Sequence, residues 1–265
     1  MAIVLLSATE GHPVISFNWV ITVPKHLTEE TFDDWYLGKH TEYAKIAHKI
    51  VRYCINRRVS EQPAVAHGEF FRIAQEYWET WDDMVACWNH HSGYALLGDG
   101  MAYMGLDPGT LPGIALTEET QFDVARPAQF STIRRGYRAR PDGTISKLIA
   151  FGTANDRGGI KEWYAKRFAG LGKDPLVREH VFGTTVGKTI RLGYIATLPN
   201  PNQTCYDWNL ELWFESNADA HSYLKSAPFN DMFSQLRSVS SDTIAGLFRG
   251  QEMLMLNTAM RHRDE

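Results

Sequence analysis

The sequence carries the same order of segments twice, and this internal repeat constrains the fold more than any other feature. Residues 14–23 (VISFNWVITV) alternate apolar and more polar side chains, as a half-buried strand does. Residues 144–154 (TISKLIAFGTA) hold the equivalent place about 130 residues later. Each strand precedes a segment of helical periodicity with a Trp-Tyr pair, in WYLGKH (35–40) and WYAKRF (163–168). The repeat therefore predicts two similar units.

Two strands, a helix and a closing strand are predicted to follow in each half. In the first half they cover residues 50–60, 68–78, 81–91 and 113–125, and in the second half residues 188–198, 206–214, 217–236 and 252–258. The order βαββαβ is that of a ferredoxin-like unit. We therefore predict an α+β fold of two such units, residues 1–126 and 127–265, with a boundary near Arg126 and Pro127. Residues 92–113 have no counterpart and are predicted to form a lid or an extra helix.

The strand patterns also predict what the two units bury between them. A ferredoxin-like unit covers one face of its sheet with helices, so two units can join their free faces in a barrel. When Trp78 is aligned with Trp213, Glu76 falls on Glu211. The faces assigned to the interior carry Asn18, Arg72, Glu76, Trp78, Asp207, Asn209, Glu211 and Trp213. Because buried charges are costly unless they are paired or hydrated, we interpret this interior as a solvated cavity that binds a small molecule.

Several motifs resemble the EthD-like branch of the dimeric α+β barrel superfamily. They lie in TFDDWYLGKHTEYAKIAHKIVRYCIN, EYWETWDDM and YDWNLELWFESNADA, and the family pattern falls on Trp35, Tyr36, His40, Arg52, Tyr53, Asn56, Glu76 and Trp78. The resemblance implies two ferredoxin-like units in one intramolecular barrel. Members of the superfamily include cofactor-free isomerases, cyclases, oxygenases, proteins similar to dehydratases or decarboxylases, and haem-binding proteins. The second half departs from the pattern, because Phe168 stands where the first half has His40.

His40 is the first candidate catalytic residue, because an imidazole can gain or lose a proton near neutral pH. The structural alternative is an imidazole that only hydrogen-bonds to a backbone carbonyl. Glu76 and Glu211 are candidate acids or bases, since two carboxylates that share an apolar cavity raise the pKa of at least one of them. The alternative is that each carboxylate forms an ion pair with a nearby arginine.

The remaining candidates would bind the substrate. Tyr53 would polarise a substrate oxygen as a fourth catalytic residue, and Trp78 and Trp213 would enclose an aromatic ring. The predicted substrate-binding set is Asn18, Tyr36, Trp78, Asp207, Asn209 and Trp213. Most buried tyrosines and tryptophans only pack, which is the alternative for each of these aromatic residues.

Composition and missing motifs narrow the class of function. The net charge of −4 without a basic cluster argues against nucleic-acid binding, and no apolar run is long enough for a membrane span. Three widely spaced cysteines are typical of a reducing cytoplasm. The sequence contains no dinucleotide, P-loop or nucleophile-elbow motif and no metal-ligand spacing.

We therefore expect a cofactor-independent lyase or isomerase, with no metal, that acts on a small oxygenated aromatic or polyketide-like substrate. The alternatives are a haem-binding barrel and a small-molecule binding protein without catalysis. Because fusion already pairs the two units, a monomer satisfies the geometry, and a homodimer through the outer surfaces is the alternative.

Overall fold

We describe the protein from a computed structural model, which describes residues 14–64, 66, 68, 70–105, 113–123, 144–171, 173–186, 190–192, 196–198 and 204–253. The boundary expected at Arg126 and Pro127 lies outside these residues, so the division into 1–126 and 127–265 stays a prediction.

Each half contains the elements of one βαββαβ unit. The first unit consists of β1 (Val14–Ile21), α1 (Glu29–Trp35), the π-helix η1 (Tyr36–His40), α2 (Thr41–Lys45), β2 (Arg52–Arg58), β3 (Arg72–Trp78), α3 (Trp81–Trp88), α4 (His91–Met104) and β4 (Gly113–Asp123). The second consists of β5 (Thr144–Ala154), α6 (Arg157–Leu171), β6 (Val177–Thr185), β7 (Ile190–Leu192), β8 (Ala196–Leu198), β9 (Cys205–Tyr206), β10 (Trp208–Phe214), α7 (Asn217–Leu224), α8 (Ala227–Val239) and β11 (Ser240–Met253).

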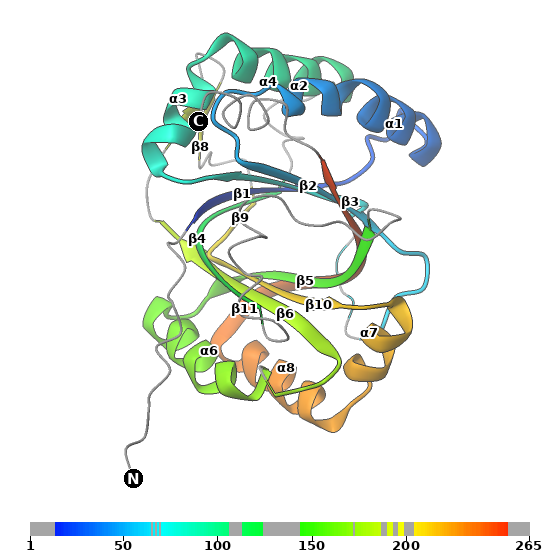
Figure 1. Cartoon of the computed structure of the whole chain (residues 1–265), viewed down its shortest axis with the longest axis vertical. Helices are drawn as coiled ribbons and strands as arrows, with labels where there is room; N and C mark the ends of the chain where they lie inside the picture. Colours follow the sequence, from blue (N-terminus) through cyan, green and yellow to red (C-terminus); the bar gives the residue numbers. More distant parts are fainter. Residues whose placement is uncertain are drawn as a thin grey trace, which may run out of the picture.

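Eight of the strands form a closed antiparallel barrel. In the first unit the strand order is β4-β1-β3-β2, and in the second it is β11-β5-β10-β6. Pairing of β2 with β11 and of β4 with β6 joins the two sheets, so one chain closes the barrel. The helices cover the outside, with α1–α4 on one side and α6–α8 on the other (Figure 1). The predicted fold class, two ferredoxin-like units in an intramolecular α+β barrel, is confirmed.

The helices begin and end at residues that satisfy their terminal backbone groups. Thr28, the predicted N-cap of α1, accepts a hydrogen bond at Oγ1 from the Thr31 amide at 3.1 Å. Thr80 and Ser216 cap α3 and α7 in the same way. Gly105 ends α4 in the left-handed conformation, with φ of 60°, which costs glycine little.

Two strands of the second half differ from the prediction. The strand next to β10 is β6, whereas residues 190–192 and 196–198 within the predicted segment 188–198 pair with each other as β7 and β8. In β6 the neighbouring residues Glu179 and His180 are both buried, because the barrel covers one face of this strand and the helices cover the other. Such a strand lacks the alternation of polar and apolar residues by which a sequence pattern identifies a strand. The closing strand β11 begins at Ser240, well before the predicted residues 252–258.

The predicted alignment of β3 with β10, in which Trp78 corresponds to Trp213, is wrong by one residue. In β10 the predicted faces are correct: Trp208, Leu210, Leu212 and Phe214 pack against the helices. In β3 the predicted faces are reversed, because Glu76 and Trp78 face the helices, whereas Gln75 points into the barrel and contacts Glu211.

The helix caps that follow the two strands give the correct alignment. Thr80 and Ser216 occupy the same position, so Trp78 corresponds to Phe214 and Gln75 to Glu211. A shift of one residue moves every side chain to the opposite face of a strand. For this reason the predicted interior residues Arg72, Glu76 and Trp78 lie outside the barrel.

Candidate functional site

The barrel interior contains a buried ion pair between Lys147 of β5 and Glu211 of β10. The Lys147 Nζ lies 3.2 Å from the Glu211 Oε2, and neither side chain is exposed. Glu211 also accepts hydrogen bonds from the Gln75 amide and, at 2.7 Å, from the Trp213 indole. Burial raises the pKa of Glu211, but Lys147 and these donors lower it by more, so its pKa lies below the ordinary value. The pair is therefore charged.

The other predicted interior residues belong to the same polar core. Asn18 donates to Ser16 Oγ at 2.7 Å and accepts from Gln75 at 2.7 Å, while Asn209 accepts from Thr117 at 3.1 Å. The contacts of Gln75 with Glu211 and of Thr117 with Asn209 link the two units across the barrel. The prediction that Glu76 and Glu211 face each other across one cavity is wrong, because these two carboxylates lie on opposite sides of the sheet.

The predicted residues Asp207, Trp213 and Trp78 do not share one site. Asp207 is at the rim, where it accepts a hydrogen bond from the Ala154 amide at 3.2 Å and lies 3.7 Å from Arg157. Trp213 forms a cation–π contact with Lys147, whose Nζ lies 4.1 Å from the ring centroid. Trp78 instead contacts Trp88 on the helix side, so Trp78 and Trp213 do not enclose a ring between them.

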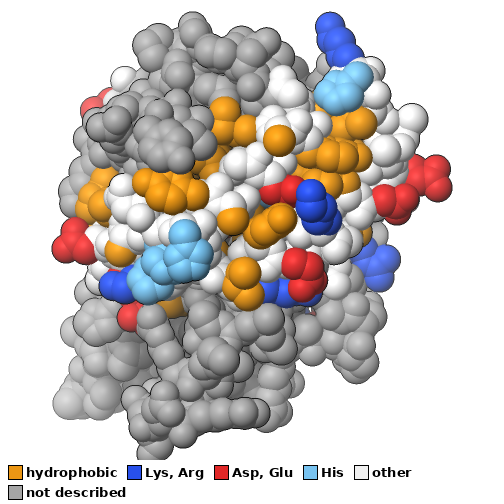
Figure 2. All heavy atoms as spheres, turned by 90° about the horizontal axis from the view of Figure 1, so that it is seen from above, with side chains coloured by type: hydrophobic (Ala, Val, Ile, Leu, Met, Phe, Trp, Pro, Cys, Tyr) orange, Lys and Arg blue, Asp and Glu red, His pale blue; other side chains and the backbone are white. Residues whose placement is uncertain are grey.

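A different cavity brings several predicted residues together. It lies in the first unit between the outer face of β1 and β3 and the helices η1, α3 and α4, and its volume is about 50 Å³. Its polar members are Trp19, Tyr36, His40, Glu76 and Trp88, and its apolar members are Ile21, Leu96, Leu97, Gly100, Met101 and Met104. A water molecule needs about 10–15 Å³ by this measure, so the space admits roughly one small ring. Figure 2 shows the outer face of this helix layer, where apolar side chains reach the surface.

His40 is held in the cavity wall by Asp99 of α4. The His40 Nδ1 lies 3.1 Å from Asp99 Oδ2, and Asp99 is also contacted by Lys39 Nζ at 2.8 Å and by the Trp35 indole at 3.1 Å. Burial raises the pKa of Asp99, but Lys39 and His40 lower it by more, so the carboxylate is ionised and can only accept. A neutral His40 therefore carries its proton on Nδ1, which leaves the Nε2 lone pair available.

The protonation states of His40 and Glu76 follow from their burial. Burial lowers the pKa of His40 more than Asp99 raises it, so the imidazole is neutral at pH 7. Burial raises the pKa of Glu76 to about 8, and a hydrogen bond from the Trp19 indole at 3.4 Å only partly opposes this. The cavity thus holds a neutral base and a protonated carboxyl group at neutral pH.

Tyr36 and Tyr53 form a buried pair behind His40. Their hydroxyl oxygens are 2.8 Å apart, and burial raises the pKa of both. Tyr36 lines the cavity, and the Arg72 guanidinium covers its ring at 4.6 Å. Arg72 in turn forms an ion pair with Asp33. Tyr53 is not among the described residues that line the cavity, so its place next to a substrate oxygen stays a prediction.

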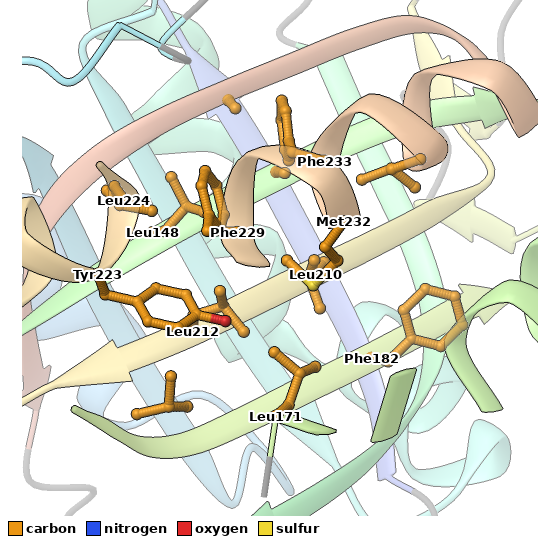
Figure 3. Packing of buried hydrophobic residues seen from close by; sticks show 14 of the residues in the cluster. Leu148, Leu171, Phe182, Leu210, Leu212, Tyr223, Leu224, Phe229, Met232 and Phe233 are labelled. Carbon is orange, nitrogen blue, oxygen red and sulfur yellow. The ribbon is translucent and has the colours of Figure 1, made fainter. Parts of the chain in front are cut away.

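Apolar side chains predominate at the corresponding place in the second unit, beside a hydrogen bond of 2.8 Å between Tyr164 and His180. Leu212 occupies the strand position equivalent to Glu76, and it packs with Leu148 and Leu210 against Phe229 and Phe233 of α8 (Figure 3). The side chain of Phe168 is outside the described residues. Leu212 in place of Glu76 removes the carboxyl group from this position of the second unit.

Asp99 and Gly100 are site residues that sequence reasoning missed. Both lie in GDGMAYMG, which resembles a glycine-rich loop in the sequence but forms the second half of α4. A β-carbon at Gly100 would lie 3.2 Å from His40 Cε1, so glycine leaves this side of the ring open. The helical spacing of Leu96, Gly100 and Met104 is the signal that could have identified the helix. The segment 92–113 therefore supplies an extra helix over its described part.

The described residues offer neither a metal site nor a fitting haem site. Within the described ranges no three His, Cys, Asp or Glu side chains come together in a way that could hold a metal ion. A haem is too large for a cavity of about 50 Å³, so His40 does not offer a fitting haem site in this structure. The described helices include none that is long and apolar enough to cross a membrane.

Comparisons with known proteins find likeness in structure alone. No family model and no curated protein sequence matches the chain. Among solved structures, an anthrone oxidase-like protein aligns with a TM-score of 0.59 and 11% identity over 93% of this chain and 95% of its own. A proposed monooxygenase of Fusobacterium nucleatum aligns with a TM-score of 0.51 and 9% identity over 91% and 93%. An EthD family protein of Bacillus halodurans aligns with a TM-score of 0.34 and 16% identity over 40% of this chain and 97% of its own. The first two alignments extend over nearly the whole chain, and they confirm the α+β barrel of two ferredoxin-like units that the sequence predicts.

Proposed function

We propose that the protein is an enzyme that moves a proton on a small, neutral, oxygenated molecule bound in the His40 cavity, without a cofactor. One arrangement carries the proposal: an imidazole and a carboxyl group line the same apolar cavity, and burial shifts their pKa values in opposite directions. Near neutral pH the imidazole is then a base and the carboxyl group an acid, as proton-transfer catalysis requires.

The roles of the side chains follow from their hydrogen bonds. His40 Nε2 removes a proton from the carbon next to a substrate carbonyl, and Glu76 donates a hydrogen bond to the carbonyl oxygen as negative charge develops there. Asp99 keeps the proton on Nδ1 and stabilises the imidazolium that forms. Return of the proton to another atom gives an isomerase, and departure of a leaving group gives a lyase. A single aromatic or polyketide-like ring suits the apolar wall of α4.

An oxidase is the second candidate. Two of the structural neighbours that align over nearly the whole chain bear the names anthrone oxidase-like protein and proposed monooxygenase. Oxidation of a CH₂ group can begin with the same proton removal. Molecular oxygen would then convert the CH₂ group to a carbonyl group, with its second oxygen atom leaving as water. Oxygen consumption in step with product formation, measured with an electrode, separates this candidate from a lyase or isomerase.

Proton transfer is tested without knowledge of the natural substrate by deuterium exchange. The full chain in D₂O is incubated with cyclopentanone, and loss of the α-proton signals is followed by NMR. We expect faster exchange than in buffer containing the same concentration of serum albumin. Exchange at the control rate, with cyclopentanone bound, would identify a binding protein without catalysis.

The pH dependence gives a separate prediction for Glu76. The rate should rise with pH as His40 loses its proton, below the ordinary pKa of about 6.5, and fall above about pH 8 as Glu76 ionises. Glu76→Gln keeps a neutral donor that does not titrate, so the fall above pH 8 should disappear. Exchange measured from pH 5 to 10 checks this, with Glu79→Gln as the exposed neighbouring control. An unchanged alkaline fall in Glu76→Gln would assign it to another group.

Gly100→Ala should reduce activity while the protein stays folded. Alanine favours a helix by about 0.5–1 kcal/mol over glycine, which opposes the cost of the close contact with His40, so the variant should remain folded in thermal unfolding. The added methyl group would lie 3.2 Å from His40 Cε1 and narrow the cavity, so cyclopentanone exchange should fall at least about tenfold. Gly98→Ala, on the same helix with no atom within 4 Å, is the matched control and should exchange normally.

A further inference from the structure

The first unit contains a second hollow, much larger than the His40 cavity. It is an open groove of about 490 Å³ that lies where β1 and β2 end and just before β3 begins. None of its described lining residues belongs to the His40 cavity, so the two are separate places on the molecule. Clefts that bind small molecules in proteins usually have volumes of about 300–1,000 Å³. The groove therefore has the size of a small-molecule site.

Two arginines at the end of β2 lie on phenylalanine rings along this groove. The Arg57 guanidinium carbon is 5.0 Å from the centroid of the Phe71 ring. The Arg58 guanidinium carbon is 5.1 Å from the centroid of the Phe70 ring. Arg58 Nη1 also donates to the backbone carbonyls of Gly68 at 2.8 Å and of Phe70 at 3.3 Å. The Arg58 side chain is thus held in place by the protein, which lowers the entropy cost of binding a ligand there.

The two arginines differ in the carboxylates beside them. Arg57 Nε lies 2.7 Å from Asp33 Oδ2, and Arg57 Nη2 lies 3.8 Å from Glu29 Oε2. Arg58 forms no ion pair with a described carboxylate, and its Nε and Nη2 donate to no described acceptor. Neither nitrogen is one of the described buried atoms that lack a partner, so both are reachable from the solvent. Arg58 therefore offers a fixed, accessible and uncompensated positive charge.

We propose that this groove binds a small aromatic molecule that carries one carboxylate group. Arg58 Nε and Nη2 donate to the carboxylate, whose planar pair of oxygens matches the guanidinium. The half-buried side chains of Val23, Val59 and Phe71 contact the ring of the ligand, and their removal from water favours binding. The Glu29 carboxylate in the same lining repels further negative charge, so the groove selects a monoanion. The proposal is independent of the proposed function.

Three small probes separate the contribution of the charge from that of the ring. Benzoate has both, benzamide has the same shape without the charge, and acetate has the carboxylate without the ring. Full-length protein labelled with ¹⁵N at its arginines is titrated with each probe, and the Arg58 Nε resonance is identified by its loss in Arg58→Gln. We expect benzoate to shift this resonance in a saturable way and to bind at least about threefold more tightly than benzamide or acetate.

Arg58→Gln should abolish the preference for benzoate over benzamide, because glutamine carries no charge. Arg237→Gln is the matched control. The Arg237 guanidinium also lies on a phenylalanine ring, 5.3 Å from the Phe233 centroid, but it belongs to α8 of the second unit. This control should keep the preference. If Arg58→Gln does not fold, the response of the wild-type resonance to the three probes decides.

The inference is overturned if benzoate leaves the Arg58 resonance unchanged or if Arg58→Gln retains the preference. Benzamide that binds as tightly as benzoate would show that the charge is not recognised, and acetate that binds as tightly would show that the ring is not. Either result contradicts the proposed ligand class. Deuterium exchange into cyclopentanone is a separate measurement, so loss of the proposed function and loss of this inference are told apart.

Discussion

Replacing His40 with Asn should reduce deuterium exchange into cyclopentanone by about 10²–10⁴-fold, the usual contribution of a positioned acid or base. Asparagine can still donate a hydrogen bond to Asp99, so the contacts of Asp99 with Lys39 and Trp35 should survive. Circular dichroism and thermal unfolding check that the fold is retained. His48→Asn, which changes a histidine outside the described cavity lining, should exchange like the wild type. Full exchange in His40→Asn would remove the imidazole from the mechanism.

Asp99→Asn tests how His40 is positioned. An amide at this place can donate to His40 Nδ1, which would move the proton to Nε2 and remove the base from the cavity. We expect exchange to fall while the ring stays in place, and we expect the ¹⁵N shifts of the His40 side chain to report the opposite tautomer. A normal tautomer together with reduced exchange would mean that Asp99 acts in another way.

Lys147→Met should lower the free energy of unfolding by about 3–5 kcal/mol, the cost of leaving one partner of a buried ion pair unpaired. Glu211 would then be a fully buried carboxylate without a cation at 3.2 Å. Urea unfolding of the variant and the wild type measures the difference. Lys166→Met removes an exposed pair with Glu162 and should change the free energy of unfolding far less than Lys147→Met, which makes it the matched control.

The double variant Lys147→Met, Glu211→Gln identifies the cause of this loss. Glutamine carries no charge and can still accept from the Gln75 amide or the Trp213 indole. The double variant should therefore be more stable than Lys147→Met alone, although it carries one more substitution. If it is less stable, loss of packing around the lysine side chain explains the effect better than an unpaired charge.

The sequence indicated the architecture because repetition, periodicity and helix caps are local signals. The strand at residues 144–154 is predicted with its observed bounds, and Thr28 is the observed cap of α1. The alternation in WNLELWF gives the correct faces of β10, since one face packs on apolar helices. The strand β6 has no such contrast, because the barrel and the helices cover its two faces and residues on both are buried.

The sequence predicted only part of the candidate site. His40, Tyr36 and Glu76 are predicted residues that line one cavity, but Glu76 reaches it from the face opposite to the predicted one. Asp99 is 59 positions from His40 in the chain, and nothing in either local pattern indicates that the two meet.

The sequence by itself determined two βαββαβ units, the alternating faces of β10 and a histidine that the second copy lacks. The tertiary structure decided which residues meet. The observed faces of β3 are opposite to the predicted ones, so Glu76 lies outside the barrel in the same cavity as His40. Gln75 lies inside the barrel and contacts Glu211, 136 positions away. The physical reason is that side chains alternate along a strand, so function depends on register. Register is set by strand pairing and by the face that each strand buries, whereas similar residue types in the two repeats can be aligned with either face.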